Sequence, residues 1–469
     1  MSCVTLLVAL LISNTSLTII HPENGETYSD DRLDIRVIVE NENELPDSVH
    51  YSLNGQSVVD IPRLNTDWYT YMANDNRTGY SESPAPHDNT ILWTAPISGT
   101  YHEFVSPVIV NSRVYFASEE DEIAYCLSAA TGEEIWRFEN IGDEIDDAMH
   151  VKDNMVYLAS DSIWCLDALT GAKIWSFGDS FSRFSGPPVP HNGRLFVDGN
   201  FVYSLDAATG DEIWKSSDTL LSVSSMTAWN GLLFVSVPVP RRWNEGSLYA
   251  LDTSTGEIVW ANKCGNIWDS SPVVADGTIY IGTMTGSLFA IDAATGTTVW
   301  ESSQFTYIES TPAIHEGSIL FGNLERSIYS VDRSNGDIQW EYEIPTGDYL
   351  HGSPGVADGL VFWGDCQRMT VDSIATIHAV DIRSGTEVWS YDTCGGFNGI
   401  QSSPAITDGV MYIAATDGNL YAFGTGLKYS YHDNIFVNAG TRELIVTAYY
   451  EGSAFAADTI RFKVIEPSY

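Results

Sequence analysis

The sequence predicts an all-β protein, an eight-bladed β-propeller inserted into a split β-sandwich. Three observations predict this architecture: a turn-and-strand motif that recurs about every 40 residues, strand-like segments at both ends that lack the motif, and the lack of any helical apolar pattern. The chain has 469 residues, which is enough for two or more domains.

The recurring motif joins a turn of the form D-x-x-T-G to a strand that carries a tryptophan, as in DAATGTTVW at 292–300. Seven copies occur, four with the full D-x-x-T-G turn and three that vary at its first or fourth residue, and their tryptophans lie 39 to 49 residues apart. In the turn, Asp and Thr oxygens accept backbone hydrogen bonds and the glycine adopts a positive φ. Each period has room for four short strands, which is typical of a propeller blade.

An eighth tryptophan has the strand, in TILWTAP, but lacks the turn, while the last unit, 402–423, stops before its fourth strand. We expect the strand from the start of the propeller to complete that last blade, so that strands from both ends close a ring over 66–425. The large flat rings suit packing between blades better than a cofactor platform. The repeat tryptophans are Trp93, Trp136, Trp175, Trp214, Trp260, Trp300, Trp340 and Trp389.

These repeats resemble the PQQ-like repeat family of eight-bladed propellers. That superfamily includes quinoprotein alcohol dehydrogenases and the non-catalytic outer-membrane assembly lipoprotein of Gram-negative bacteria. The lead-in DWYTYMANDNRTGYSESPAP (67–86) is similar to the segment that precedes such propellers in many archaeal surface proteins. The resemblance implies the fold strongly and the function weakly.

The two ends of the chain, 16–65 and 426–469, alternate apolar and polar residues as strands do. Neither fragment is large enough to bury a core alone, so we expect them to form one immunoglobulin-like sandwich that carries the propeller as an insertion. Both fragments resemble bacterial and archaeal Ig-like surface modules. Residues 1–15 hold an apolar run shorter than the ~20 residues of a membrane-spanning helix, which we interpret as a signal segment, either cleaved or truncated.

The composition is strongly acidic, with 63 acidic and 22 basic side chains and a net charge of −41. Such a chain repels phosphate, which excludes a nucleic-acid partner. An ordinary apolar fraction of 44% combined with this charge favours a halophilic, archaeal source, because high salt screens the repulsion. An acidic secreted protein at ordinary salt is the alternative.

We expect binding on the face of the ring formed by the connections between blades and the loops between second and third strands. We call this the connection face. Exposed aromatic and basic side chains there suit a protein or glycan partner, although they would also serve merely to cover the blade ends. The candidate binding residues are Arg241, Arg242, Trp243, Trp268, Tyr307, Tyr349, His351 and Phe397.

Three further candidate sites follow from residue types. Carboxylates in two loops could hold calcium, although clusters arise easily in so acidic a chain: Glu119, Glu120, Asp121, Asp143, Asp146 and Asp147. Cys366 and Cys394 both fall on the connection face, where a disulfide is geometrically feasible. The sequons at Asn14 and Asn76 would accept glycans if the chain is exported.

Catalysis has no candidate constellation in the sequence. The resemblance implies that a quinoprotein dehydrogenase would hold its quinone against two adjacent cysteines, beside calcium and a catalytic aspartate, and no Cys-Cys pair occurs. We therefore predict a non-catalytic, secreted or cell-surface propeller that binds a protein or glycan and carries no redox cofactor. The alternatives are a self-assembling component of a cell coat, filament or virion and, third, a quinoprotein-type oxidoreductase.

Overall fold

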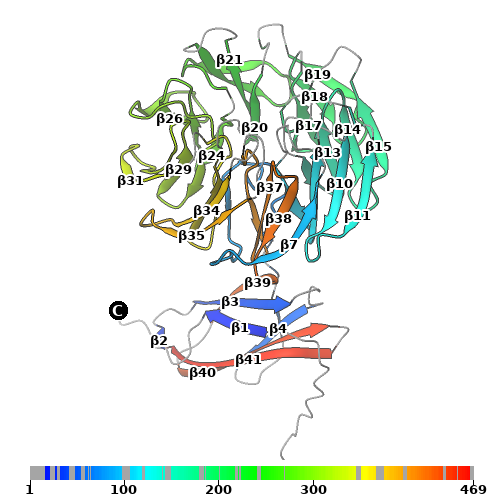
Figure 1. Ribbon diagram of the computed structural model, residues 1–469, viewed down its shortest axis with the longest axis vertical. Coiled ribbons are helices and arrows are strands. Elements are labelled where there is room, and N and C mark those ends of the chain that lie inside the picture. Colours follow the sequence, from blue (N-terminus) through cyan, green and yellow to red (C-terminus); the bar gives the residue numbers. More distant parts are fainter. Residues whose placement is uncertain are drawn as a thin grey trace, which may run out of the picture. The chain divides into compact units, whose positions relative to one another are not determined.

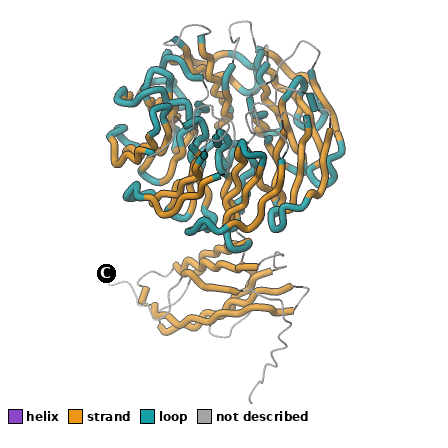
Figure 2. The backbone as a smooth tube through the Cα atoms, in the orientation of Figure 1, coloured by secondary structure: helices purple, strands orange, loops and turns teal. Residues whose placement is uncertain are grey.

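In the computed structural model, the described residues form strands, turns and loops with no helix among them, so the all-β prediction is confirmed (Figure 1) (Figure 2). Accordingly, this part of the chain offers no helix that could span a membrane. The chain divides into two compact units: Asp67–Thr407 with Met411–Phe423, and Met1–Thr66 with Asp408–Val410 and Gly424–Tyr469. The structure describes residues 16–21, 27–28, 32–41, 48–53, 59–61, 63, 65–97, 106–118, 122–139, 141–142, 149–178, 184, 186–199, 201–216, 220, 223–239, 245–268, 270–344, 350–365, 374–393, 399–436, 440–450 and 453–464.

The larger unit is a ring of eight antiparallel sheets, each with four blade strands ordered from the axis outwards, which confirms the eight-bladed propeller (Figure 1). Blades one and two are β8 (Val108–Val110), β9 (Arg113–Ser118), β10 (Ile123–Ser128) and β11 (Glu134–Glu139), then β12 (His150–Lys152), β13 (Met155–Ala159), β14 (Ile163–Asp167) and β15 (Lys173–Phe177). Blades three and four are β16 (Val189–His191), β17 (Arg194–Val197), β18 (Tyr203–Asp206) and β19 (Glu212–Lys215), then β20 (Ser225–Trp229), β21 (Leu232–Pro238), β22 (Gly246–Asp252) and β23 (Ile258–Asn262).

The second half of the ring repeats this plan. Blades five and six are β24 (Val273–Ala275), β25 (Thr278–Gly282), β26 (Leu288–Asp292) and β27 (Thr298–Ser302), then β28 (Ala313–His315), β29 (Ser318–Gly322), β30 (Ser327–Asp332) and β31 (Ile338–Glu343). Blade seven is β32 (Gly355–Ala357), β33 (Leu360–Gly364), β34 (Thr376–Asp381) and β35 (Glu387–Asp392). Blade eight is β36 (Ala405–Thr407), β37 (Val410–Ala415), β38 (Asn419–Phe423) and β7 (Ile91–Pro96).

Blade eight closes the ring with strands from both ends of the propeller, as the sequence predicts. The outermost strand β7 precedes blade one in the chain and pairs antiparallel with β38, with Trp93 opposite Ala422. Because blade eight lacks the T-G turn, the indole N–H of Trp389 in blade seven instead donates to the carbonyl of Pro86, at 3.0 Å. The residues just before β7 therefore replace the missing turn.

The repeat tryptophans pack between neighbouring blades, as predicted. The indole N–H of Trp136 donates to the carbonyl of Ala168, at 3.0 Å, in the T-G turn of the next blade. The indole also lies against the glycine of that turn, since a Cβ added to Gly171 would lie 2.7 Å from the Trp136 ring. Gly171 has a φ of +70° as well, so the turn needs glycine for its backbone and for its space. The turn and the tryptophan recur together because every repeat tryptophan except Trp389 packs on the turn of the following blade.

The turn aspartates accept the predicted hydrogen bonds. The Oδ1 atom of Asp292 accepts the backbone N–H and the hydroxyl of Thr295, at 2.8 and 2.7 Å. These bonds stabilise the charged carboxylate, and they lower the pKa of Asp292.

The smaller unit contains two sheets to which both ends of the chain contribute. One sheet is β1 (Ser16–His21), β3 (Arg32–Asn41) and β39 (Leu427–Phe436), and the other is β2 (Thr27–Tyr28), β41 (Ser453–Val464), β40 (Gly440–Tyr450), β4 (Ser48–Leu53) and β5 (Val59–Ile61). Val37 and Val39 from the first sheet and Val49 and Val446 from the second are buried. Strand β1 also contacts β40 and β41, so the two sheets form two layers over a shared apolar core. The domain boundaries 16–65 and 426–469 stay predictions.

Candidate functional site

The lead-in, residues 67–81, runs inside the ring along the innermost strands of the blades. An innermost strand has one edge without a neighbour in its own blade, and that edge faces the axis. Trp68 exchanges two backbone hydrogen bonds with Ile109 of blade one, and β6 (Tyr80–Ser81) pairs in parallel with β32. Lead-in carbonyls also accept N–H groups from three further innermost strands, Tyr69 from Val151, Asn76 from Val274 and Thr78 from Ile314, and Gly79 accepts that of Val356 in β32. The chain thus covers the inner edges of five blades with its own backbone.

Arg77 lies at the centre of this arrangement. It is 2% exposed, its Nη1 donates to the hydroxyl of Ser271 at 2.8 Å, and its guanidinium lies 5.6 Å from the ring centre of Tyr71. The Tyr71 hydroxyl is 2.7 Å from the Oγ of Ser353. Sequence reasoning missed these residues because the lead-in has no repeat; the apolar and aromatic letters of WYTYM were its one signal of burial.

A chain of hydroxyl groups joins neighbouring blades at the start of their innermost strands. The backbone N–H of Ser271 donates to Thr311, that of Thr311 to Ser353, and that of Ser353 to Ser403, each to the side-chain oxygen and at 2.8 to 2.9 Å. Ser403 donates in the same way to Ser106 of blade one at 2.9 Å. The repeated hydroxyl thus satisfies a buried N–H of the preceding blade and holds the ring in register.

Blade two carries a buried histidine as the first residue of its innermost strand. His150 is 2% exposed and packs against the ring of Tyr69, with centroids 5.6 Å apart, while its Nε2 lies 3.7 Å from an Oδ1 of Asp75. The other oxygen of Asp75 accepts a hydrogen bond from Lys152 at 2.8 Å. Burial, and then the charges of Lys152 and Arg77, hold the pKa of His150 well below its ordinary value, so the ring is neutral at pH 7.

We expect His150 to make the stability of the propeller depend on pH. Its pKa is lower in the folded than in the unfolded chain, so below the unfolded value of about 6.5 the unfolded chain binds a proton that the folded chain does not. The free energy of unfolding should therefore fall on acidification by up to ~1.4 kcal/mol per pH unit. Urea unfolding of wild type and His150→Gln at pH 7.5 to 5 measures this. The difference between the two proteins should change with pH, and parallel curves for His150→Gln and wild type would contradict the assignment.

Three of the predicted binding residues on the connection face lie in the described part of the chain. Trp268, in the connection to blade five, is 44% exposed, and Tyr307, in the connection to blade six, is 51% exposed. His351, at the start of blade seven, has its Nδ1 2.9 Å from an oxygen of the largely buried Glu309. Arg241, Arg242, Trp243, Tyr349 and Phe397 lie outside the described residues.

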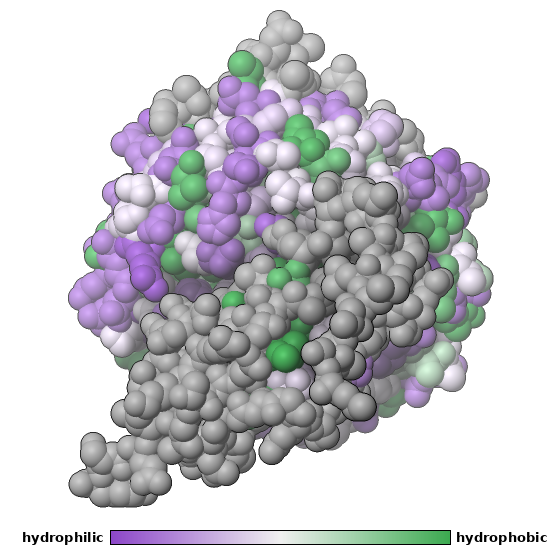
Figure 3. All heavy atoms as spheres, turned by 90° about the horizontal axis from the view of Figure 1, so that it is seen from below, coloured by the Kyte–Doolittle hydropathy of each residue, from purple (hydrophilic) through white to green (hydrophobic). Residues whose placement is uncertain are grey.

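Tyr307 is held in place by its backbone. Its φ is +31°, in the left-handed region that a bulky residue adopts at a cost, and its carbonyl accepts the N–H of Leu324 at 3.1 Å. Among the large hydrophobic residues that the structure describes as exposed, Tyr307 and Trp268 are the two aromatic ones. The other exposed members of that group are aliphatic. On the one face that Figure 3 shows, hydrophobic side chains form separate patches among hydrophilic ones.

Of the remaining predicted site residues, only Asn76 lies in the part of the chain that the structure describes. The calcium candidates Glu119, Glu120, Asp121, Asp143, Asp146 and Asp147, the disulfide candidates Cys366 and Cys394, and the sequon residue Asn14 lie outside the described residues. Asn76 is part of the lead-in; its glycosylation stays a prediction. Cys126 and Cys165 are fully buried free thiols in blade cores, and burial raises the pKa of each to about 12.

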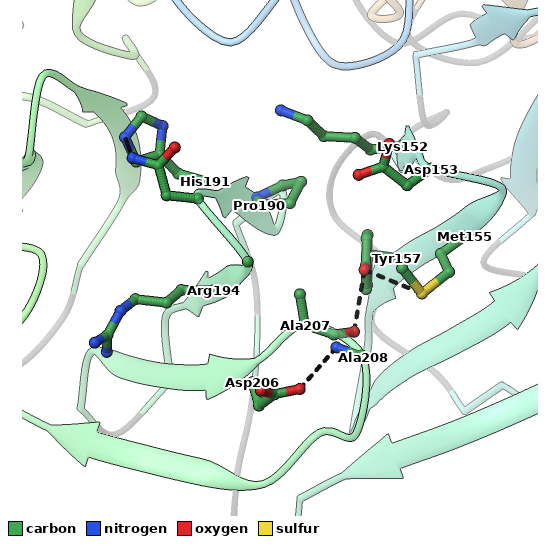
Figure 4. Close-up of a pocket in the computed structure, with 12 residues that line it drawn as sticks. Lys152, Asp153, Met155, Tyr157, Pro190, His191, Arg194, Asp206, Ala207 and Ala208 are labelled. Atoms are coloured by element: carbon green, nitrogen blue, oxygen red, sulfur yellow. Dashed lines mark hydrogen bonds between the residues drawn. The ribbon is translucent and has the colours of Figure 1, made fainter.

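Two hollows lie on the opposite side of the ring, which we call the turn face because turns there join the first strand of a blade to the second and the third to the fourth. One hollow, of about 270 Å³, has Asp75, Asn76 and Trp229 among its walls. The other, of about 300 Å³, lies between blades two and three (Figure 4). There, Asp153 and Lys152 come from blade two, His191 and Arg194 from blade three, and the hydroxyl of Tyr157 lies between Met155 and Ala207.

Comparison with known proteins supports the fold and the repeat. The family described as outer membrane protein assembly factor BamB matches residues 83–181, 159–263, 244–365 and 347–428. No curated protein matches the chain. Among solved structures, BamB from Moraxella catarrhalis superposes with a TM-score of 0.55 at 18% identity, covering 71% of this chain and 98% of that one.

Dehydrogenases share the same fold. Quinohemoprotein alcohol dehydrogenase from Comamonas testosteroni has a TM-score of 0.61 at 14% identity, with 78% of this chain and 80% of that one covered. A europium-containing methanol dehydrogenase has a TM-score of 0.62 at 14% identity, with 77% and 98% covered. At such identities the likeness shows the fold alone.

The residues of this chain do not fit the quinone site that the resemblance to these dehydrogenases implies. The chain has no two adjacent cysteines. Within its described part, no three His, Cys, Asp or Glu side chains are grouped to hold one metal ion. We therefore assign no residue to a quinone or its metal.

Proposed function

The chain belongs to the outer membrane protein assembly factor BamB family, and from this membership we propose that it is a non-catalytic binding scaffold of the cell envelope whose partner is a protein. The propeller is a rigid support, because its blades are joined by tryptophan–turn contacts, the hydroxyl chain and the lead-in. Loops on such a support are the usual place for binding residues. The immunoglobulin-like character of the smaller unit and a location outside the cell belong to the same proposal.

The observation that carries the proposal is the pair of exposed aromatic side chains, Trp268 and Tyr307, on adjoining connections of the connection face. Large aromatic side chains that stay in contact with water on a fixed backbone are typical anchors of protein interfaces. The contact of His351 with Glu309, at 2.9 Å, joins the connections to blades six and seven. The predicted residues Arg241, Arg242 and Trp243 would extend this surface on blade four.

The lead-in supports a binding role over a catalytic one. The inner strand edges of five blades are occupied by the chain itself, and the buried Arg77 has Ser271 and Tyr71 as neighbours. This packing leaves those groups engaged in structure, and none of them is presented to a substrate.

Capture of the partner tests the proposal. The tagged protein is used to pull partners from the native envelope fraction, and the double variant Trp268→Ala/Tyr307→Ala is compared with Ile213→Ala/Val299→Ala, which removes two exposed aliphatic side chains from the outer strands β19 and β27. We expect the aromatic variant to bind its protein partner at least about tenfold more weakly, since each anchor contributes ~1 kcal/mol or more. The aliphatic variant should bind as wild type does. Equal capture by all three proteins would refute the connection-face site.

A further inference from the structure

The gaps between blades on the turn face are filled by arginine side chains at two places. Between blades five and six, Arg333 donates from Nη2 to Asp276 at 2.7 Å, from Nε to the hydroxyl of Tyr280 at 3.0 Å and from Nη1 to the carbonyl of Glu316 at 3.3 Å. Its guanidinium also lies 5.4 Å from the ring centre of Tyr280. A carboxylate, a tyrosine and a carbonyl thus form a receptor for one guanidinium group.

Between blades one and two, the arginine belongs to the first of the two blades, whereas Arg333 belongs to the second blade of its pair. Arg113 is the first residue of β9, and its Nη1 reaches the carbonyls of Ala168 and Leu169 in the turn of blade two, at 3.3 and 3.0 Å. Here Asn111 occupies the turn position that Asp276 has in blade five. The guanidinium of Arg113 therefore meets carbonyl oxygens and no turn carboxylate.

The gap between blades two and three has an equivalent carboxylate, tyrosine and carbonyl. It lacks an arginine at both of the positions that Arg333 and Arg113 occupy in the other two gaps. Tyr157 pairs with the first residue of β12 as Tyr280 pairs with the first residue of β24, and Asp153 follows β12 as Asp276 follows β24. The carbonyl equivalent to that of Glu316 belongs to Asn192. The position of Arg333, directly after the turn aspartate, is Ala207, and the position of Arg113 is Met155. The hollow of about 300 Å³ occupies this place.

The groups around the hollow are available to a ligand. Among described residues, the carboxylate of Asp153 has no hydrogen bond or ion pair. The Tyr157 hydroxyl donates to the carbonyl of Ala207 at 3.1 Å, which leaves its oxygen free to accept. Aliphatic groups of Met155, Pro190, Ala207 and Ala208 line the hollow and suit the methylene stem of an arginine.

The cationic side chains nearby are engaged elsewhere. Lys152 binds Asp75 at 2.8 Å, and Arg194 binds the hydroxyl of Ser204 at 3.4 Å. Burial lowers the pKa of His191, so its ring is uncharged at pH 7. The turn aspartate of blade seven, Asp358, has the imidazole of His87 at 2.9 Å, which leaves Asp153 unusual in having no basic neighbour bound to it.

We propose that the hollow between blades two and three is a receptor for the guanidinium group of an arginine on a partner protein. The same three groups already bind a guanidinium between blades five and six, and here they bind none of the arginines that the structure describes. The planar fork of guanidinium, with its donors in fixed directions, matches this arrangement better than the ammonium of lysine. The site lies on the turn face, so it goes beyond the partner contact proposed for the connection face and does not depend on it.

Titration of the full-length protein with N-acetyl-L-arginine amide, followed by calorimetry and by NMR of the ligand, tests the receptor. We expect one saturable site with a Kd on the order of millimolar, as suits a single side chain. N-acetyl-L-lysine amide should bind several-fold more weakly, and N-acetyl-L-norleucine amide should show no saturable binding. Equal binding of the arginine and lysine probes would show general cation attraction and overturn the proposal.

Substitutions distinguish arginine binding at this hollow from general attraction of cations to an acidic protein. Asp153→Asn should weaken arginine binding at least about tenfold, while Asp276→Asn, which removes the same charge beside the resident Arg333, should leave the first site intact. Arg333→Ala should open an equivalent receptor and raise the stoichiometry from one to two. Ala207→Arg should fill the hollow from within and abolish binding. Unchanged affinity in Asp153→Asn, or a stoichiometry of one in folded Arg333→Ala, would refute the proposal.

Discussion

Trp136→Ala should lower the free energy of unfolding of the propeller by about 3–5 kcal/mol, the usual cost of removing a large ring from a packed site. Trp136 is 7% exposed, its ring covers the turn glycine of blade two and its N–H binds the carbonyl of Ala168. Urea unfolding followed by circular dichroism measures the change. Because the indole ring of Trp136 contacts the turn of blade two, its removal should loosen the contact between blades one and two.

Two further substitutions show whether packing or hydrogen bonding carries that effect. Trp136→Phe keeps a ring but loses the indole N–H, and it should cost only about 1 kcal/mol, because Tyr115 and Arg113 also donate to Ala168. Trp268→Ala removes the same side chain from an exposed position and should change the free energy of unfolding by less than ~0.5 kcal/mol. A similar loss at Trp268 and Trp136 would mean that the repeat tryptophans have no special role between blades.

Arg77→Ala should be the second most damaging change, at about 3–4 kcal/mol, because it removes a buried charged hydrogen bond and leaves a cavity. Ser271 would lose its donor, and the ring of Tyr71 would lose its cationic neighbour. We also expect the lead-in to become sensitive to limited proteolysis, since its contacts with the inner strands depend on this packing. Unfolding midpoints and the rate of cleavage in residues 67–81 measure both effects.

The control for Arg77 is an arginine on the surface. Arg137 pairs with Glu134 on the exposed strand β11, and Arg137→Ala should leave the unfolding midpoint unchanged. Arg77→Met keeps most of the buried volume and should recover roughly half of the loss. An Arg77→Ala variant as stable and as protease-resistant as wild type would show that the lead-in does not stabilise the ring.

The propeller could be predicted from sequence because each blade repeats the same local chemistry. The turn aspartate, the glycine and the tryptophan are close in the chain, and their spacing gives the blade count and the closing strand at Trp93 directly. The reason for their joint recurrence could not be predicted, because the tryptophan of one blade, such as Trp136, packs on the turn glycine of the next blade, here Gly171. That contact joins residues 35 apart and becomes visible only in the folded ring.

The lead-in and the turn-face hollow could not be predicted for a related reason. The lead-in binds through backbone carbonyls, which carry no side-chain signature, and its buried Arg77 looks like any surface arginine in the sequence. The hollow depends on comparing one gap between blades with another: Ala207 is notable only once Arg333 is known to fill the equivalent position. Of the residues predicted for the connection face, Trp268 and Tyr307 are exposed, and their role in binding stays a prediction.

Retention of a quinone tests most directly whether this propeller is a binding scaffold and not a dehydrogenase. The purified protein is incubated with pyrroloquinoline quinone and Ca²⁺, passed through gel filtration and examined for quinone absorbance and for dye-linked oxidation of alcohols. We predict that the quinone separates from the protein and that no alcohol is oxidised. Stoichiometric quinone in the protein peak together with alcohol-dependent dye reduction would contradict the account.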